Sequence, residues 1–191
     1  MSTKPRDQSP GFHHVFTRGN NKRITYKDDA DRWFFCRTVD RVAKKSHWSI
    51  AAYCLMRNHY HLVVIVGDKG LASGMCELNT AYAVNYNARH GRINHLFGKR
   101  YGNKPLRTEA SVMNAVRYVV QNPWRAGGKK PLEKYVWSSY AATIGLTFPR
   151  MKLDRDALLQ FFGNTPETAM ASFKEFCSST PLSEHVRRQP P

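Results

Sequence analysis

Two histidines separated by one residue, His59 and His61, are the first feature of this 191-residue chain that suggests chemistry. They open the segment HYHLVVIV, whose β-branched residues predict a strand over 59–66. Side chains two residues apart on a strand point to the same face, so both imidazoles are expected on one side of a sheet. Such a pair can bind one divalent cation. Because the chain has eight histidines, a chance pair on a half-buried strand explains the pattern equally well.

A tyrosine with two carboxamides forms the second candidate group. Thr108 can cap a helix that runs to Asn122, and Pro123 ends it. At about 100° per residue, one face of this helix carries Asn114, Tyr118 and Asn122. The far side carries Val112, Val116, Val119 and Val120. The competing interpretation is the exposed polar face of an ordinary amphipathic helix.

The two groups suggest a reaction only when they are taken together. Packed across the sheet, the helix would bring Tyr118 and the amide oxygen of Asn122 to His59 and His61. Two imidazole nitrogens and one amide oxygen, with positions left for water and phosphate, suit Mg²⁺ or Mn²⁺. The Tyr118 phenol would then attack a phosphorus whose oxygens the cation polarises. Because a phenolate leaves more readily than an alkoxide, a DNA hydroxyl can reverse the phosphotyrosine link.

The segments that must position these residues show strand and helix patterns in turn. Residues 13–18 predict a short strand closed by a turn at 19–21, and 48–56 with 59–66 predict an antiparallel hairpin. Helices are expected from Asp28 to Lys45 and over 71–90, 108–122, 154–162 and 166–177. Residues 92–107 predict strand fragments and an exposed basic loop. This order predicts an α+β fold in which helices sandwich an antiparallel sheet.

The charge of the chain indicates a polyanionic partner. Its 30 Lys and Arg against 14 Asp and Glu give a net charge of +16, and nucleic acid is the commonest polyanion. No apolar run approaches the roughly 18 residues of a transmembrane helix, and no signal peptide is visible, so we expect a cytoplasmic protein without a membrane partner. The four cysteines are expected to be reduced, buried, structural thiols. Residues 1–11 are expected to form a flexible leader, and 143–191 a helical extension with a loose tail.

Five ordered blocks resemble those of a known family. The chain resembles the single-tyrosine HUH transposases, most closely the REP-associated tyrosine transposases. The blocks are His14-Val15 with Arg18-Gly19-Asn20, MRNHYHL at 56–62, the segment 86–101, Tyr118 with Asn122-Pro123 and Arg125-Ala126-Gly127, and WSSY at 137–140. Together they cover residues 12–142, which would be the transposase domain. Two residues depart from the family pattern, Arg57 where proline is usual and His13 where tyrosine is common.

The resemblance implies a fold, an activity and a set of ligands. It implies an HUH-type sheet with both histidines on a central strand, and a metal-dependent endonuclease and strand transferase that acts on single-stranded DNA. His59, His61 and Asn122 would hold Mg²⁺ or Mn²⁺, and Tyr118 would form a 5′-phosphotyrosine and free a 3′-hydroxyl. The implied substrate is a REP-like hairpin with a short guide sequence beside it. It also implies a bacterial, nucleoid-associated location, and it leaves monomer and homodimer open.

A hairpin presents phosphates on both strands of its stem, so cations should dominate its affinity. The candidate DNA contacts are Arg18, Asn20, Lys22, Arg23, Arg57, Lys99, Arg100, Tyr101, Lys104 and Arg125. Among them, Tyr101 is expected to stack on an unpaired base. Two alternatives stay open: a catalytically retired protein that binds hairpin DNA without cleaving it, and an RNA-binding protein with a metal-stabilised fold. A covalent DNA adduct would exclude both.

Overall fold

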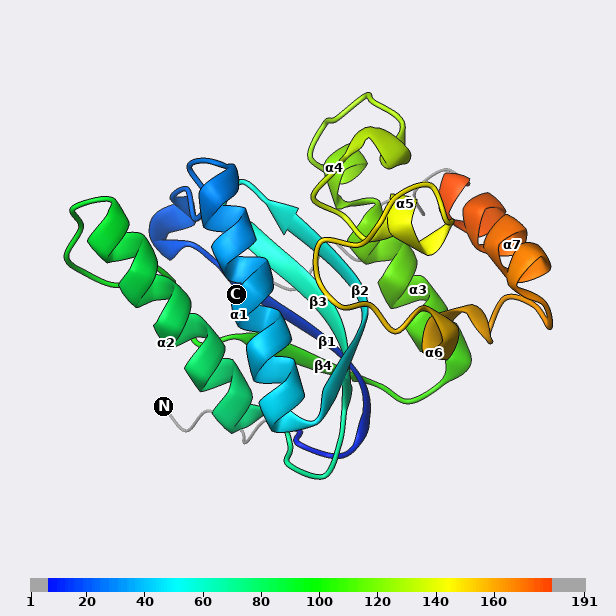
Figure 1. Ribbon diagram of the computed structural model, residues 1–191, viewed down its shortest axis with the longest axis horizontal. Coiled ribbons are helices and arrows are strands. Elements are labelled where there is room, and N and C mark those ends of the chain that lie inside the picture. Colours follow the sequence, from blue (N-terminus) through cyan, green and yellow to red (C-terminus); the bar gives the residue numbers. More distant parts are fainter. Residues whose placement is uncertain (1–6, 180–191) are drawn as a thin grey trace.

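A four-stranded antiparallel sheet in the order β2-β3-β1-β4 forms the centre of the computed structural model, which describes residues 7–179 (Figure 1). The strands are β1 (Gly11–Arg18), β2 (Trp48–Met56), β3 (His59–Val66) and β4 (Gly102–Leu106). The two strands in the middle, β3 and β1, are those that carry the histidines. The α+β prediction, with an antiparallel sheet covered by helices, is confirmed.

Helices lie on both faces of this sheet. The two long helices α1 (Asp29–Ser46) and α2 (Ala72–Arg89) cover one face, and α3 (Glu109–Val120) covers the other (Figure 1). The remaining helical segments are short or C-terminal: η1 (Asn20–Lys22), α4 (Asn122–Arg125), η2 (Leu132–Lys134), α5 (Tyr140–Thr143), α6 (Arg155–Leu159) and α7 (Pro166–Ser178). Within residues 7–179, no helix is both long and apolar enough to cross a membrane.

Side-chain capping fixes where the main helices begin. The carboxylate of Asp28 accepts a hydrogen bond from the backbone amide of Asp31 at the start of α1. At the start of α3, Thr108 and Ser111 form a reciprocal capping box, because each side chain bonds the other residue's backbone N–H. The predicted cap at Thr108 is therefore confirmed, and it sets the register of the helix that carries Tyr118.

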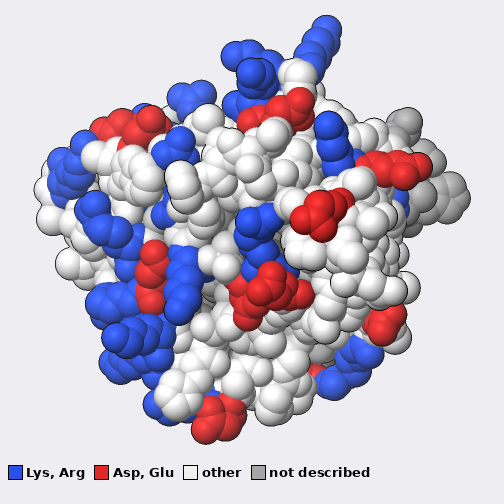
Figure 2. Space-filling view, turned by 45° about the vertical axis from the view of Figure 1, so that its right-hand side comes forward, with Lys and Arg blue, Asp and Glu red and all other residues white. Residues whose placement is uncertain are grey.

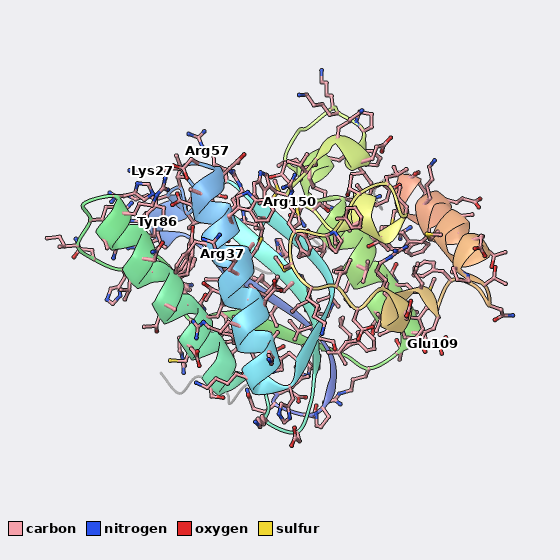
Figure 3. All side chains as sticks on the ribbon, in the orientation of Figure 1. Lys27, Arg37, Arg57, Tyr86, Glu109 and Arg150 are labelled. Atoms are coloured by element: carbon pink, nitrogen blue, oxygen red, sulfur yellow. The ribbon has the colours of Figure 1, made fainter. Side chains whose placement is uncertain are left out.

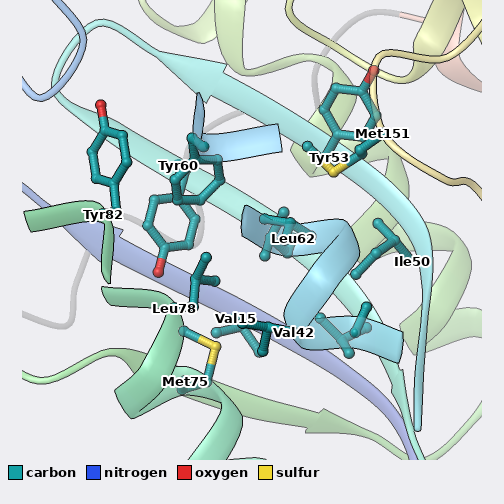
Figure 4. Packing of buried hydrophobic residues seen from close by; sticks show 14 of the residues in the cluster. Val15, Val42, Ile50, Tyr53, Tyr60, Leu62, Met75, Leu78, Tyr82 and Met151 are labelled. Carbon is teal, nitrogen blue, oxygen red and sulfur yellow. The ribbon is translucent and has the colours of Figure 1, made fainter. Parts of the chain in front are cut away.

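Alternation along the strands assigns each side chain to one of two cores. The face under α1 and α2 receives Val15, Tyr60 and Leu62, which pack with Val42, Leu78 and other apolar side chains of those helices (Figure 4). The residues between them on β1 and β3 point to the opposite face, toward α3. The imidazoles of His59 and His61 therefore lie on the α3 face, as the strand pattern predicts.

The core on the α3 face extends into the C-terminal segment. The four valines of α3 that the helix pattern assigns to the interior are all buried there. The same cluster contains Leu158 of α6 and Phe173 of α7 together with Cys54 and Val63 of the sheet. Residues 155–178 thus share a core with the sheet that carries the histidines, whereas the boundary at 142/143 stays a prediction.

The outer edge of β2 is covered by the segment that follows η2. The amide of Leu55 donates to the carbonyl of Trp137 at 2.9 Å, and the amide of Ser139 donates to the carbonyl of Tyr53 at 3.0 Å. Arg150 lies against the indole rings of Trp33 and Trp137, with centroid distances of 5.0 and 4.8 Å. The WSSY block, which the sequence left without a function, therefore closes an exposed sheet edge.

Two expectations need correction. Residues 1–6 of the expected leader lie outside the described residues, but its following residues are held in place: the side chain of Gln8 accepts from the amides of Leu71 and Ala72, and Gly11 already begins β1. Cys76 is exposed on α2, although the other three cysteines are buried thiols. Residues 92–107 contain β4 at the edge of the sheet, where Pro105 is tolerated.

Candidate functional site

Tyr118 contacts two histidines between α3 and the sheet, and a third histidine lies next to one of them. Its ring centroid lies 5.5 Å from that of His61 and 5.7 Å from that of His14, and both contacts are edge-on. The rings of His59 and His61 are 5.1 Å apart and perpendicular. All four side chains belong to one chain, so the groups converge without a second copy.

Two residues of the polar stripe of α3, Tyr118 and Asn122, therefore face the imidazoles, whereas Asn114 is exposed and accepts a hydrogen bond from Arg117. Tyr118 is 38% exposed, which leaves its phenol accessible from solvent. The guanidinium of Arg125 lies 5.0 Å from the centroid of the Tyr118 ring. This cation–π contact holds the ring in place and puts a positive charge beside it.

Two neighbouring segments fix the orientation of His59. The side-chain amide of Asn58 donates to the carbonyl of Lys22 at 2.9 Å, so its oxygen must face the other way. That oxygen lies 2.7 Å from Nδ1 of His59 and accepts its proton. The Nε2 atom of His59 is thus left with a free lone pair, the form in which an imidazole binds a metal.

The loop after β1 supports this arrangement. The amide of Gly19 donates to the carbonyl of Asn58 at 2.8 Å, and the amide of Thr25 donates to the carbonyl of Arg57 at 3.0 Å. A side chain at position 19 would place its Cβ 2.2 Å from the carbonyl oxygen of Arg23, so only glycine fits there. The Arg-Gly-Asn block and the MRNHYHL block are therefore two parts of one hydrogen-bonded support.

His14 gives His61 an equivalent partner. Nε2 of His14 lies 2.9 Å from Nδ1 of His61, and the two rings stack with centroids 5.1 Å apart. Both side chains are buried. When His61 donates its Nδ1 proton to His14, its Nε2 lone pair is free, which matches the state of His59.

Burial keeps these imidazoles neutral. It lowers the pKa of His14 to about 4, helped by the positive charge of Lys104. Burial also lowers the pKa of His59 to about 4, with Arg18 acting in the same direction and a hydrogen bond to Asn122 acting against it. The pKa of His61 is held well below its usual range by burial, the other two imidazoles and Arg18. A neutral imidazole can offer a lone pair to a metal ion. The nearby cations favour an anionic ligand beside that metal ion, such as a phosphate group.

The donor set fits a divalent cation with two imidazoles and one amide. Asn122 is buried and donates its amide to the carbonyl of Tyr118 at 2.9 Å, which leaves its oxygen on the side of His59. In the part of the chain that the structure describes, no group of three or more histidine, cysteine and carboxylate side chains is arranged to hold a metal ion. Among the residues near the two imidazoles, Asn122 offers an amide oxygen as a third donor. A cation held without a carboxylate keeps its full charge available for phosphate oxygens.

The chain matches a known protein family. Residues 9–122 match the family model described as "Transposase IS200 like". The chain belongs to this family. The transposase is also similar to a solved structure of a REP-associated tyrosine transposase bound to a REP hairpin, with a TM-score of 0.64 and 18% identity. That match covers 77% of this chain and 88% of the other and shows the shared fold. A comparison with curated proteins found no match.

Most of the predicted DNA contacts lie on the surface of the transposase. Arg57 projects from the turn between β2 and β3, at the end of the sheet where Lys27 lies (Figure 3). The exposed members of the predicted set are Arg18, Lys22, Arg23, Arg57, Lys99, Arg100, Lys104 and Arg125. Cations are numerous elsewhere too, and Figure 2 shows Lys and Arg gathered at the lower left of one face with acidic residues among them. The net charge alone therefore does not locate the DNA.

Two of the predicted DNA-contact residues, Tyr101 and Asn20, are not exposed. Tyr101 is only 7% exposed and belongs to the core under α1 and α2, so its ring offers no surface to a base. This prediction is wrong because the segment before β4 turns its aromatic residue inward. Asn20 is half-buried, and its backbone amide donates to the carbonyl of Leu96 at 2.8 Å.

Three residues shape the site although no sequence pattern pointed to them as functional: His14, Phe16 and Asn58. His14 and Phe16 are two residues apart on β1 and share the face of the paired histidines, because Phe16 lies opposite His61 in the register. Applying the two-residue strand rule to 13–18 as well as 59–66 would have found them. The role of Asn58 depends on a loop contact that no sequence pattern reveals.

Proposed function

We propose that the transposase cleaves and rejoins single-stranded DNA, with Tyr118 as the nucleophile. The observation that supports this most strongly is the position of the Tyr118 ring, 5.5 Å from His61 and 5.7 Å from His14 in the same chain. The phenol is exposed, whereas the imidazoles behind it are buried and neutral. A surface tyrosine of purely structural role would need no such surroundings.

In the proposed reaction, the Tyr118 oxygen bonds to the phosphorus of a phosphodiester as the bond from phosphorus to the 3′-oxygen breaks. The phenol loses its proton, the 3′-oxygen gains one, and the products are a 5′-phosphotyrosine and a free 3′-hydroxyl. Arg125 holds the phenol ring against the site. The reverse reaction with another 3′-hydroxyl joins a new strand and restores Tyr118.

His59, His61 and Asn122 are the residues that would hold Mg²⁺ or Mn²⁺. The bound cation would polarise phosphate oxygens and offset the negative charge of the transition state. Asn58 and His14 hold the two ligand imidazoles in the tautomer that presents Nε2. Arg18, which acts electrostatically on His59 and His61, and Lys104, which acts on His14, would attract the phosphate backbone.

We propose hairpin DNA with an adjacent unpaired guide sequence as the substrate. The structural neighbour was solved with a REP hairpin, and the net charge of +16 favours a polyanion with phosphates on both stem strands. The protein would then act on nucleoid DNA in the cytoplasm. Because the catalytic groups come from one chain, we infer that a monomer can complete the site.

The test is a denaturing gel of end-labelled hairpin oligonucleotides incubated with the protein and Mn²⁺. The wild type is expected to give a covalent protein–DNA band that disappears with Tyr118→Phe and with EDTA. Tyr118→Phe should still bind the same oligonucleotide at close to wild-type affinity, since it loses a single hydroxyl. Hairpin binding by a wild type that never forms the band would instead establish the alternative, a catalytically retired hairpin-binding protein.

A further inference from the structure

The aromatic side chain of Phe16 lies open to solvent beside the proposed nucleophile. Phe16 is on β1 next to β3, yet it is 41% exposed. Its ring centroid is 5.3 Å from that of His14 and 5.8 Å from that of His61. Tyr118 contacts both of these imidazoles. The exposed ring therefore borders the place where the phosphodiester would react.

The two residues that precede Phe16 on this face of β1 are covered by other side chains. Phe12 packs edge-on against Phe161, with ring centroids 5.7 Å apart, and His14 lies under Tyr118. Phe16 is the next residue in this row, and α3 leaves it uncovered. A phenylalanine that contributed only to folding would be expected to lie as deep as Phe12 does.

The strand beside Phe16 has a glycine at the position over which the Phe16 ring lies. Gly102 of β4 pairs with Phe16 in the register. A Cβ at position 102 would lie 2.3 Å from Cζ of Phe16 and 2.4 Å from Cε2, so no other residue fits without moving the ring. The ring thus rests on bare β4 backbone on one side and is accessible on the other.

The charges around the ring are those that suit a nucleic acid strand. Arg18 is two residues further along β1, Lys104 acts electrostatically on His14, and Arg125 covers Tyr118. An apolar ring between cations matches a nucleotide, whose base stacks on aromatic rings while its phosphates contact the cations. A protein partner would require a wider apolar surface than one ring.

We propose that Phe16 is the stacking platform for an unpaired DNA base that flanks the phosphodiester attacked by Tyr118. This inference rests on the proposed function, and it adds a positioning residue to it. A base stacked on Phe16 would hold its neighbouring phosphate against His61 and the phenol. Base–aromatic stacking of this kind changes affinity by about 5- to 150-fold.

The first measurement detects the stacking itself. A fluorescent purine analogue, whose emission is quenched when it stacks, is placed in turn at each unpaired position that flanks the stem of the hairpin oligonucleotide. Binding is measured with Tyr118→Phe, which cannot cleave. At one position, the emission should be quenched by Tyr118→Phe and by the double variant that also carries Phe16→Trp. The quenching should be lost in the double variant that also carries Phe16→Ala. Phe148→Ala, which removes a 95% exposed ring elsewhere, is the matched control and should keep it.

The second measurement separates stacking from damage to the site. With subsaturating oligonucleotide, Phe16→Ala should slow adduct formation about 5- to 150-fold, whereas Phe16→Trp and Phe148→Ala stay within about 2-fold of wild type. Mn²⁺ affinity measured by calorimetry should be the same for Phe16→Ala and wild type. If Phe16→Ala lowers Mn²⁺ affinity as much as the rate, or leaves quenching unchanged, the inference is wrong. If the wild type forms no adduct while quenching still depends on Phe16, the proposed function fails and the stacking platform stands.

Discussion

Replacing Phe173 with alanine tests whether the C-terminal helices are part of the domain that carries the site. Phe173 of α7 is fully buried, with ring centroids 5.1 Å from Phe162 and 5.9 Å from Tyr140. Removing such a side chain typically destabilises a protein by about 3–5 kcal/mol. For a chain of this length, about 2–4 °C of melting temperature is lost per kcal/mol, so a decrease of about 6–20 °C is expected.

The assay is thermal unfolding followed by circular dichroism, with Phe148→Ala as the control. Phe148 is 95% exposed, so its replacement should change stability by less than about 0.5 kcal/mol. Because Phe173 shares a core with the valines of α3, the whole transition should shift as one. A main transition that keeps its midpoint in Phe173→Ala, with only a small early loss of signal, would refute the shared core.

Three further predictions concern the site and its support. His14→Ala should weaken Mn²⁺ binding about 10- to 100-fold, because His61 loses the partner of its Nδ1 atom. Calorimetry measures this affinity, and His95→Ala, which replaces an exposed histidine, is the control. Equal Mn²⁺ affinities for His14→Ala and His95→Ala would show that His14 has no such role. A thiol reagent should modify one cysteine, Cys76, rapidly in the folded protein and all four in denaturant, because burial raises the pKa of Cys36, Cys54 and Cys177; rapid modification of two or more would contradict the buried environment. Hydrogen bonds from Arg89 hold the pKa of Asp28 well below its usual range, so its carboxylate stabilises the fold above about pH 3.8 and this contribution is lost as the pH falls further. Asp28→Asn keeps the helix cap, so the difference in melting temperature between wild type and variant should shrink with falling pH; a difference that stays constant between pH 7 and pH 3 would contradict the assignment.

Periodicity predicted the elements that build the site. The hairpin was predicted because β-branched runs flank a two-residue turn, and Thr108 marked the beginning of α3 through the chemistry of its hydroxyl. The valines opposite Tyr118 correctly gave the face of α3 that is buried. These are local patterns, in which each residue's environment follows from its neighbours in the chain.

What the sequence could not give are contacts between segments far apart in the chain. The bond between Asn58 and Lys22, the one between His14 and His61, and the placement of the Phe16 ring over Gly102 all depend on how strands and loops come together. Tyr101 illustrates the same limit, because a basic, glycine-rich segment indicated an exposed loop while tertiary packing turned its ring inward. The fold and the face that carries His59 and His61 were predictable from patterns, but the hydrogen-bond partners that orient the imidazole rings were not.

The most direct test of the account is the mass of one peptide. Trypsin releases Tyr118 in the peptide of residues 118–125, YVVQNPWR. After incubation with hairpin DNA and Mn²⁺, followed by nuclease and trypsin digestion, we expect this peptide to carry a nucleotide attached through a 5′-phosphate to the tyrosine. The modification should be missing when Mn²⁺ is withheld and in His61→Ala. A nucleotide on any other residue, or an adduct that survives Tyr118→Phe, would contradict the claim that phenol and imidazoles act together on one phosphodiester.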